Sequence, residues 1–276
     1  MRLRPLLALS RATWQSWMMN RTFMWLLAFG WMIPPLIYMF VWSTAAGEQG
    51  IGGISRAGFI TYYLVLILVN QLTYSQTNWT VGDLIRIGDM NKLLLRPVPP
   101  ILDAFSAEIA GKAVYLVFDV PVVLLLGLVL KPDLTFTSSA VLAFIPALLM
   151  AWLLRFFWGY WLALLAFWAT RADALLAVQD TLIFLLAGQV APIALLPGAL
   201  QTAAVVLPFR YMVGFPVEVL TGQVSGAAMQ SGLLIQAGWL ALAVSECRAS
   251  NPSSASALSS SGRLQSPPQS PLEGRR

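Results

Sequence analysis

The sequence predicts an all-α membrane protein with six transmembrane helices, and three observations carry this prediction. Hydrophobic residues make up 58% of the 276-residue chain and charged residues only 11%, whereas soluble domains carry about 25% charged residues. The mean hydropathy is +0.72. Six apolar runs also approach the roughly 20 residues that a helix needs to cross a bilayer. We therefore expect most of the chain to contact lipid or other apolar helices.

The six runs are separated by polar or proline-rich stretches. They cover residues 24–43, 57–74, 113–130, 140–168, 174–196 and 226–244. Two charged residues, Asp119 and Arg155, lie well inside the third and fourth runs. An intramembrane charge is costly and usually faces a partner or a wet cavity. Two interpretations stay open: the two side chains pair, or Arg155 reaches the inner interface while Asp119 finds another donor.

The basic residues predict the orientation, because cytoplasmic loops carry an excess of Lys and Arg. With the N-terminus inside, nine basic residues fall on the cytoplasmic side and three outside, before four in the tail are counted. The nine are Arg2, Arg4, Arg11, Arg21, Arg86, Lys92, Arg96, Lys112 and Arg171, and the three are Arg56, Lys131 and Arg210. This asymmetry predicts a cytoplasmic N-terminus and, with six spans, a cytoplasmic end to the last span.

Residues 1–22 have an amphipathic helical pattern. On a helical wheel Arg4, Arg11 and Gln15 share one stripe, and apolar residues cover the opposite arc. These apolar residues are Leu6, Leu7, Trp14, Trp17 and Met18. Such a helix is typical of the cytoplasmic membrane interface. The alternative is that this stretch is simply the solvated start of the first span.

The sequence offers little for catalysis. It has no histidine and a single cysteine, Cys247, which excludes His-based acid–base chemistry, His-metal sites and an intramolecular disulfide. It also lacks the P-loop, nucleophile-elbow and zinc-protease motifs. The net charge of +5 is spread between apolar runs and forms no stripe for nucleic acid. We expect no catalytic residues, cofactor or metal, and no nucleic-acid partner.

The longest polar segment on the predicted inner side is 75–112. Residues 81–95 can form a short amphipathic helix, and Pro97, Pro99 and Pro100 then stop it, because proline lacks a backbone donor and restricts the residue before it. A charged, proline-terminated helix between two spans can dock a cytoplasmic partner. An ordinary surface loop is the equally open alternative.

A second unusual region, residues 188–222, is here called the proline-rich segment. It is apolar, yet Pro192, Pro197, Pro208 and Pro216 interrupt it. Short apolar pieces of this kind are typical of re-entrant or interfacial helices. We expect this segment on the outer side, with Arg210 at the outer rim, and we expect residues 196–222 not to cross the membrane.

Two phrases in these regions resemble a known family. Ile87-Gly88-Asp89, followed by Leu94-Leu95-Arg96-Pro97-Val98, is similar to the cytoplasmic loop of ABC-transporter permeases of the second, exporter-like type. The prolines of residues 188–222, with Leu220-Thr221-Gly222, are similar to the outer segment of the branch that has stand-alone six-span permease subunits. The resemblance covers roughly residues 1–243.

The resemblance implies a mechanism. Two such subunits, identical or related, would pair around a substrate path in a bacterial inner membrane, and each would rest on a separate cytoplasmic ATPase. The loop at 81–97 would couple the two proteins, through Ile87, Gly88, Asp89, Leu95, Arg96 and Pro97. The chain itself would not be an enzyme, and drugs, lipids or other amphipathic molecules would be exported.

Two other functions are weighed against this one. A self-contained carrier or channel driven by an ion gradient often shows inverted repeats and midplane polar residues. The sequence shows no internal repeat, and only Asp119 and Arg155 lie well inside spans. A lipid-modifying enzyme is disfavoured by the missing histidines and acidic pairs.

The composition changes abruptly at Ser245. Residues 245–276 hold ten serines and four prolines, and such a segment cannot bury enough apolar surface to fold. The sixth run is also short and contains Gln230 and Gln236. A shifted reading frame would explain these features and the end of the resemblance. A native disordered tail after a short, tilted last span is the alternative.

Overall fold

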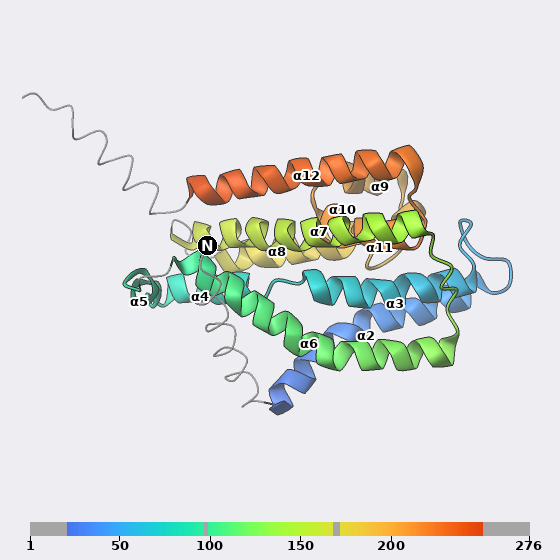
Figure 1. Cartoon of the computed structure of the whole chain (residues 1–276), viewed down its shortest axis with the longest axis horizontal. Helices are drawn as coiled ribbons and strands as arrows, with labels where there is room; N and C mark the ends of the chain where they lie inside the picture. Colours follow the sequence, from blue (N-terminus) through green and yellow to red (C-terminus); the bar gives the residue numbers. More distant parts are fainter. Residues whose placement is uncertain (1–20, 97–98, 168–171, 251–276) are drawn as a thin grey trace, which may run out of the picture.

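The computed structural model describes residues 21–96, 99–167 and 172–250. Across these ranges the elements are helices, apart from one isolated bridge between Ile51 and Ile54. The long helices share one axis and form an elongated bundle (Figure 1). The predicted interfacial helix at 1–22 lies outside the described residues except for its last two, which begin the first described helix.

Thirteen helical segments follow one another within the described residues. They are α2 (Arg21–Ala46), α3 (Arg56–Thr73), α4 (Thr77–Arg86), α5 (Met90–Leu94), α6 (Pro100–Leu130), α7 (Ser138–Leu164), η1 (Leu165–Phe167), α8 (Ala172–Leu186), η2 (Ile193–Leu195), α9 (Gly198–Val206), α10 (Phe209–Met212), α11 (Gly214–Leu220) and α12 (Gly226–Ala249). Figure 1 places α4 and α5 at one end of the bundle and α9 to α11 towards the other.

Helix α3 is the centre of the bundle. Most of its residues are buried, and it packs against α2, α6, α7 and α11. The surrounding helices instead expose large apolar side chains, such as Leu128 of α6 and Leu234 of α12. Because water would be a poor solvent for such faces, they fit contact with lipid or with another membrane subunit.

Four segments are long and apolar enough to cross a membrane among the described residues. They are Arg56–Arg86, which contains α3 and α4, together with Pro100–Leu130, Ser138–Phe167 and Gly226–Ala249. Helices α2 and α8 are not among the four. The fifth predicted span is wrong in extent, because α8 ends at Leu186 instead of continuing to residue 196. The chain turns at Gly188, where φ is +75°, a value that favours glycine.

The last helix also corrects the sequence prediction. Helix α12 continues past Val244 to Ala249 and contains 24 residues, which is enough for a full crossing. Its buried residues include Ala243 and Cys247, so the register of the buried face continues beyond the expected break at Ser245. The remainder of the predicted tail, 251–276, lies outside the described residues.

The predicted helix at 81–95 is divided in two. Helix α4 ends at Arg86, Gly88 takes a φ of +81°, and α5 begins at Met90. A positive φ is inexpensive only for glycine, so Gly88 permits the sharp turn. Pro100 then occupies the first turn of α6, where its missing N–H costs nothing.

Helices α7 and α12 form one of the most extensive interfaces, and α11 packs on α7 beside them. Gly232 of α12 is buried against the ring of Phe215 of α11, and a Cβ at Gly232 would collide with that ring. Phe215 is itself fully buried, so its ring has little room to move. Glycine at 232 therefore sets how closely α12 approaches α11.

Gly232→Ala should lower the thermal stability of the protein in detergent, because overpacking a closed contact costs about 1–3 kcal/mol. Gly238→Ala is the matched control, since Gly238 lies in the same helix with open space around its Cβ position. Alanine is favoured over glycine in helices by about 1 kcal/mol, so the control should be neutral or stabilising. Equal melting temperatures for the two variants would contradict the packing described.

Candidate functional site

The α4–α5 end of the bundle presents an exposed surface of mixed character. Ile87, Leu94 and Leu95 are 61%, 48% and 88% exposed. Beside them lie two exposed ion pairs, between Asp83 and Arg86 at 2.9 Å and between Asp89 and Lys92 at 2.8 Å. Exposed apolar side chains ringed by charges are typical of protein-binding surfaces. We call Ile87, Leu94 and Leu95 with these two ion pairs the α4–α5 surface.

The sequence-predicted coupling residues are distributed unevenly over this end. Ile87, Gly88, Asp89 and Leu95 belong to the turn and the ends of α5. Arg96 reaches Asp103 at the start of α6, with 3.7 Å between nitrogen and oxygen. Pro97 lies outside the described residues.

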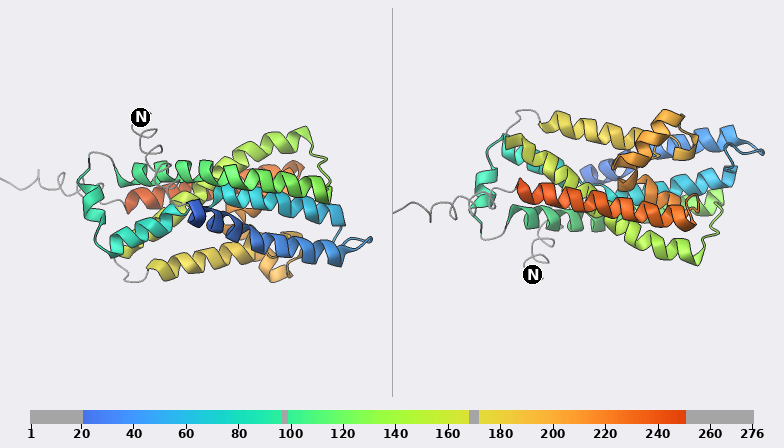
Figure 2. Two further views of the ribbon diagram at one scale, coloured as in Figure 1. Left: turned by 90° about the horizontal axis from the view of Figure 1, so that it is seen from below. Right: turned by 90° about the horizontal axis from the view of Figure 1, so that it is seen from above.

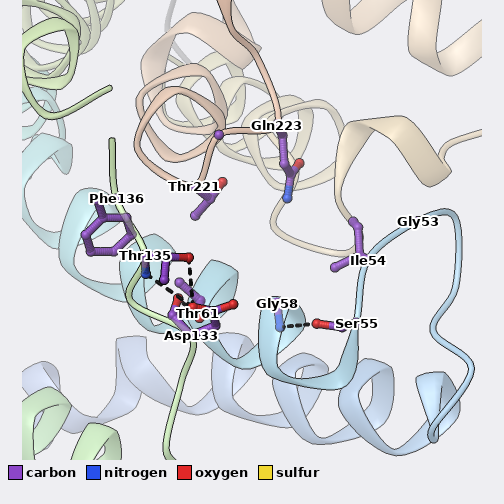
Figure 3. A pocket seen from close by; sticks show the side chains of 11 residues that line it. Gly53, Ile54, Ser55, Gly58, Thr61, Asp133, Thr135, Phe136, Thr221 and Gln223 are labelled. Carbon is purple, nitrogen blue, oxygen red and sulfur yellow. Dashed lines mark hydrogen bonds between the residues drawn. The ribbon is translucent and has the colours of Figure 1, made fainter. Parts of the chain in front are cut away.

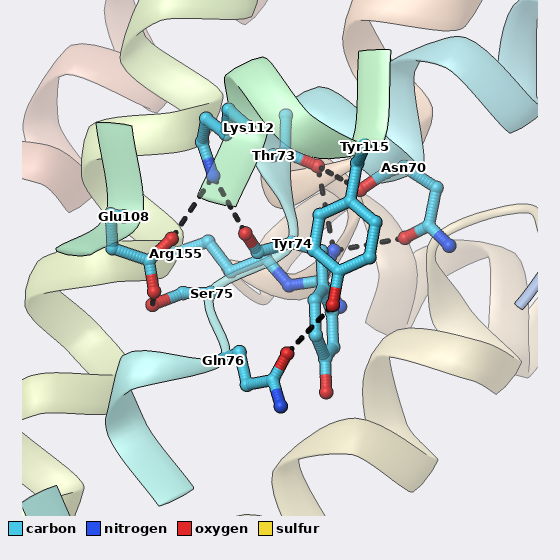
Figure 4. A network of polar contacts seen from close by, with 9 residues as sticks. All are labelled: Asn70, Thr73, Tyr74, Ser75, Gln76, Glu108, Lys112, Tyr115 and Arg155. Atoms are coloured by element: carbon cyan, nitrogen blue, oxygen red, sulfur yellow. Dashed lines mark hydrogen bonds and ion pairs between the residues drawn. The ribbon is translucent and has the colours of Figure 1, made fainter. Parts of the chain in front are cut away.

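Below this surface, a buried polar network surrounds the junction between α3 and α4 (Figure 4). We call it the Lys112 network. The Lys112 ammonium of α6 donates to the backbone oxygen of Tyr74 at 2.7 Å and to Glu108 Oε2 at 3.1 Å. Ser75 Oγ donates to Glu108 Oε1 at 3.0 Å. Lys112 therefore ties α6 to the chain at the point where α3 ends.

A second set of contacts completes the network from α6 and α7. The Tyr115 hydroxyl of α6 donates to Gln76 Oε1 at 2.9 Å. Arg155 of α7 donates from Nη1 to Asn70 Oδ1 at 2.9 Å, and its guanidinium carbon lies 5.0 Å from the ring centre of Tyr74. Helices α6 and α7 thus hold the α3–α4 junction from two sides.

The hypothesis that Asp119 and Arg155 pair directly is wrong in this structure. Arg155 is directed to Asn70 and to Thr73 Oγ1, 3.4 Å away. The carboxylate of Asp119 is completely buried, and in the described part of the chain neither of its oxygens has a hydrogen-bond partner. The alternative, another donor for Asp119, is not realised there either. The position of a residue along its predicted span could not reveal which faces of α6 and α7 meet.

Helix α4 also makes direct contact with α7 and α8. Asn78 is buried against Gly159 of α7, at a position where a Cβ on residue 159 would collide with the amide. Trp79 Nε1 donates to Asp180 Oδ2 of α8 at 3.3 Å. These contacts leave α4 little freedom to move independently of α7 and α8.

At the opposite end, the proline-rich segment is divided into short helices. Pro192, Pro197 and Pro208 stand immediately before η2, α9 and α10, and Pro216 lies in the first turn of α11. These are positions where the missing backbone N–H is not needed. The four prolines therefore start helices as well as interrupt the apolar run.

A buried ion pair stabilises this segment. Arg210 Nη2 and Nε lie 2.6 and 3.0 Å from Glu218 Oε2. Burial raises the pKa of Glu218, and the Arg210 guanidinium opposes that rise. The Arg210 side chain is only 12% exposed, so the pair is enclosed by surrounding protein. Its partner Glu218 could not be identified from sequence spacing alone, since the two belong to different short helices.

Hydrogen bonds to the start of this segment hold it against the bundle. The Tyr62 hydroxyl donates to the Gly188 oxygen at 2.9 Å. Trp42 Nε1 and the Tyr63 hydroxyl both donate to the Val190 oxygen, at 2.8 and 3.0 Å. Aromatic donors on α2 and α3 thus satisfy backbone groups that no helix satisfies.

A polar cavity of about 310 Å³ opens at this end (Figure 3). It lies between the start of α3, the α6–α7 connection and the turn after α11, and hydroxyl and amide groups line much of it. Thr61 Oγ1 donates to the Asp133 backbone oxygen at 2.8 Å, and Thr135 Oγ1 donates to the Asp133 carboxylate at 2.8 Å. Thr221 and Gln223 face these groups from the other side.

Within the described ranges, no cluster of histidine, cysteine, aspartate or glutamate could hold a metal ion. Sequence reasoning missed the Lys112 network, although one signal was available. Glu108 and Lys112 are four residues apart, the spacing of neighbours on one helical face. Their partners Ser75 and Tyr74 are remote in sequence, and only the fold brings them together.

Comparison with known proteins identifies the family. The family profile described as "ABC-2 family transporter protein" matches residues 30–247, which is most of the chain and includes the α4–α5 surface, the Lys112 network and the proline-rich segment. The match extends beyond residue 243, where the resemblance seen in the sequence ends. No individual curated protein matches the chain.

The matched domain is a membrane permease without an ATPase domain, and permeases of this family typically pair with an ABC ATPase. The match favours this assignment over an ion-coupled carrier or a lipid-modifying enzyme. The chain is a multi-pass membrane protein that belongs to the ABC-2 family of transporter permeases.

Proposed function

We propose that this chain is the membrane subunit of an ATP-driven exporter, and that a separate cytoplasmic ATPase docks on the α4–α5 surface. The exported molecule would be a drug, a lipid or another amphipathic compound. The chain would lie in a bacterial inner membrane with its N-terminus in the cytoplasm, and a second permease subunit, identical or related, would complete the substrate path.

The α4–α5 surface has the properties of a docking site. Leu95 is 88% exposed at one end of the bundle, although a large apolar side chain in water is unfavourable by about 1.5–3 kcal/mol relative to a buried one. Burial by a partner would recover this free energy. The neighbouring ion pairs are exposed, and such pairs add specificity more than affinity.

The observation that carries the proposal is the connection between this surface and the spans. Lys112, Glu108 and Ser75 join α6 to the α3–α4 junction, and Asn78 of α4 is closed against Gly159 of α7. A displacement of α4 would therefore be passed to α3, α6 and α7 together, because close-packed contacts do not deform continuously. An ATPase that closes on ATP could bias the permease between two states in this way.

Six crossings are part of the proposal. Helix α2 has 26 residues and would be about 39 Å long at 1.5 Å per residue, so it is long enough for the hydrocarbon core. Helix α8 is shorter, but it runs along the bundle axis beside the other helices (Figure 2). With α2 and α8 added to the four candidate spans, the α4–α5 surface and the end of α12 fall on one side.

Leu95→Asp should weaken association with the ATPase at least tenfold, because it replaces an exposed apolar anchor with a charge that the interface must desolvate. Co-purification of the candidate ATPase from native membranes, quantified against the amount of permease, measures the effect. Tenfold weaker association corresponds to about 1.4 kcal/mol.

The control for this experiment is Leu134→Asp. Leu134 is 62% exposed and lies in the α6–α7 connection, at the opposite end of the bundle (Figure 1). It should insert normally and retain the ATPase. If Leu95→Asp also retained the ATPase at the wild-type ratio, or if both variants lost it equally, docking on the α4–α5 surface would be refuted.

The proposed orientation predicts a labelling pattern for single cysteines placed in a Cys247→Ser background. Gln201→Cys and Ser225→Cys replace exposed residues on either side of α10 and α11. A membrane-impermeant maleimide applied from outside should label both, because the proline-rich segment starts and ends on the same side. Lys92→Cys of α5 should react only after the membrane is opened. Labelling of one outer position with protection of the other would show that the segment crosses the bilayer.

A further inference from the structure

The face of α6 that packs into the bundle carries one unpartnered acid. Tyr115, Asp119 and Val123 follow one another at four-residue spacing and are all buried, so they form one stripe of the helix. The Asp119 side chain is 0% exposed. Both of its carboxylate oxygens are closed to solvent and lack a hydrogen-bond partner in the described part of the chain.

Among the described residues, the helices packed against α6 bring no free cation to this position. These are chiefly α2, α3 and α4. The only Lys or Arg in α2 and in α3 is the first residue of each helix, Arg21 and Arg56. In α4, Arg86 is exposed and paired with Asp83.

The other ionisable groups nearby already have partners. Lys112, two turns before Asp119 on α6, is paired with Glu108, and Arg155 of α7 is held by Asn70 and Thr73. The remaining titratable groups of α2 and α3, and the one on α6 four residues before Asp119, are tyrosines. They are Tyr38 on α2, Tyr62, Tyr63 and Tyr74 on α3, and Tyr115 on α6, whose hydroxyl donates to Gln76.

An ionised carboxylate in these surroundings is physically unfavourable. Moving an unpaired charge out of water costs several kcal/mol even after the protein relaxes, and the group avoids this cost by becoming neutral. The Asp119 oxygens are closed to solvent, and none of the cations named above, which are those of the described part of these helices, is free to neutralise them. A proton is the one cation small enough to bind the carboxylate without separating α6 from the helices packed against it.

We propose that Asp119 is a proton-binding site inside the membrane domain, neutral while α6 is packed on α3 and ionised when that contact opens to water. Each opening would release a proton and each closing would take one up. Movement of α6 would then be linked to pH. This inference does not depend on the identity of the ATPase or of the substrate.

Infrared spectroscopy of the full-length chain tests the proposal directly. The protein is reconstituted in bilayers of phosphatidylethanolamine and phosphatidylglycerol near neutral pH, and wild type is compared with Asp119→Asn. The asparagine has nearly the shape of the neutral acid. The wild-type spectrum should contain the carbonyl stretch of a protonated carboxyl group, and the variant should lose it. Loss of a carboxylate band instead would overturn the proposal.

Asp173→Asn is the matched control, because Asp173 is an exposed acid in the first turn of α8. This variant should keep the protonated-carboxyl band of the wild type. If Asp119→Asn fails to fold, wild type alone is treated with dicyclohexylcarbodiimide, which adds to protonated carboxyl groups in apolar surroundings. Mass spectrometry should then find the adduct on Asp119, and an unmodified Asp119 would contradict the proposal.

Discussion

The fold depends on how buried polar groups are satisfied where α3, α6 and α7 meet near one end of the bundle. Helix α3 ends at Thr73 and α4 begins at Thr77, so the ladder of helical hydrogen bonds is interrupted between them, although the Tyr74 N–H still donates to the Asn70 oxygen at 2.7 Å. Lys112 donates to the Tyr74 oxygen in that gap and pairs with Glu108, which also accepts from Ser75. In an apolar setting, losing one partner of such a buried pair costs about 3–5 kcal/mol. The gap therefore persists only because α6 and α7 supply its polar partners.

The same solution recurs at the opposite end. The chain leaves its helical path after Leu186, and Tyr62, Tyr63 and Trp42 donate to the backbone oxygens of Gly188 and Val190. Non-helical backbone at membrane depth is tolerated where protein groups bury and satisfy it. Both irregular regions are thus anchored to α3, the most buried helix, and this places the α4–α5 surface and the proline-rich segment at fixed positions at the two ends.

Composition and periodicity were sufficient to predict an all-helical membrane protein, since long apolar runs leave few other folds. They also predicted that a helix ends before Pro97, but not the break at Gly88 that divides residues 81–95 into two helices. Other features depend on pairing between remote segments. The partners of Arg155 are on α3, Glu218 holds Arg210 across a helix break, and Asn78 requires Gly159 on α7. The predicted last span was weak because it contains Gln230 and Gln236, yet Gln236 is buried and donates to the oxygens of Ala147 and Tyr211.

The central claim is that the Lys112 network anchors the α4–α5 surface to the membrane helices. Hydrogen exchange measured by mass spectrometry on Glu108→Gln, compared with wild type in the same bilayers, tests it most directly. Because the substitution leaves the Lys112 charge without its ion-pair partner, the account predicts faster exchange at residues 74–76 and throughout α4, with α9 to α11 unchanged. Unchanged exchange in α4, or equal acceleration at both ends of the bundle, would contradict the account.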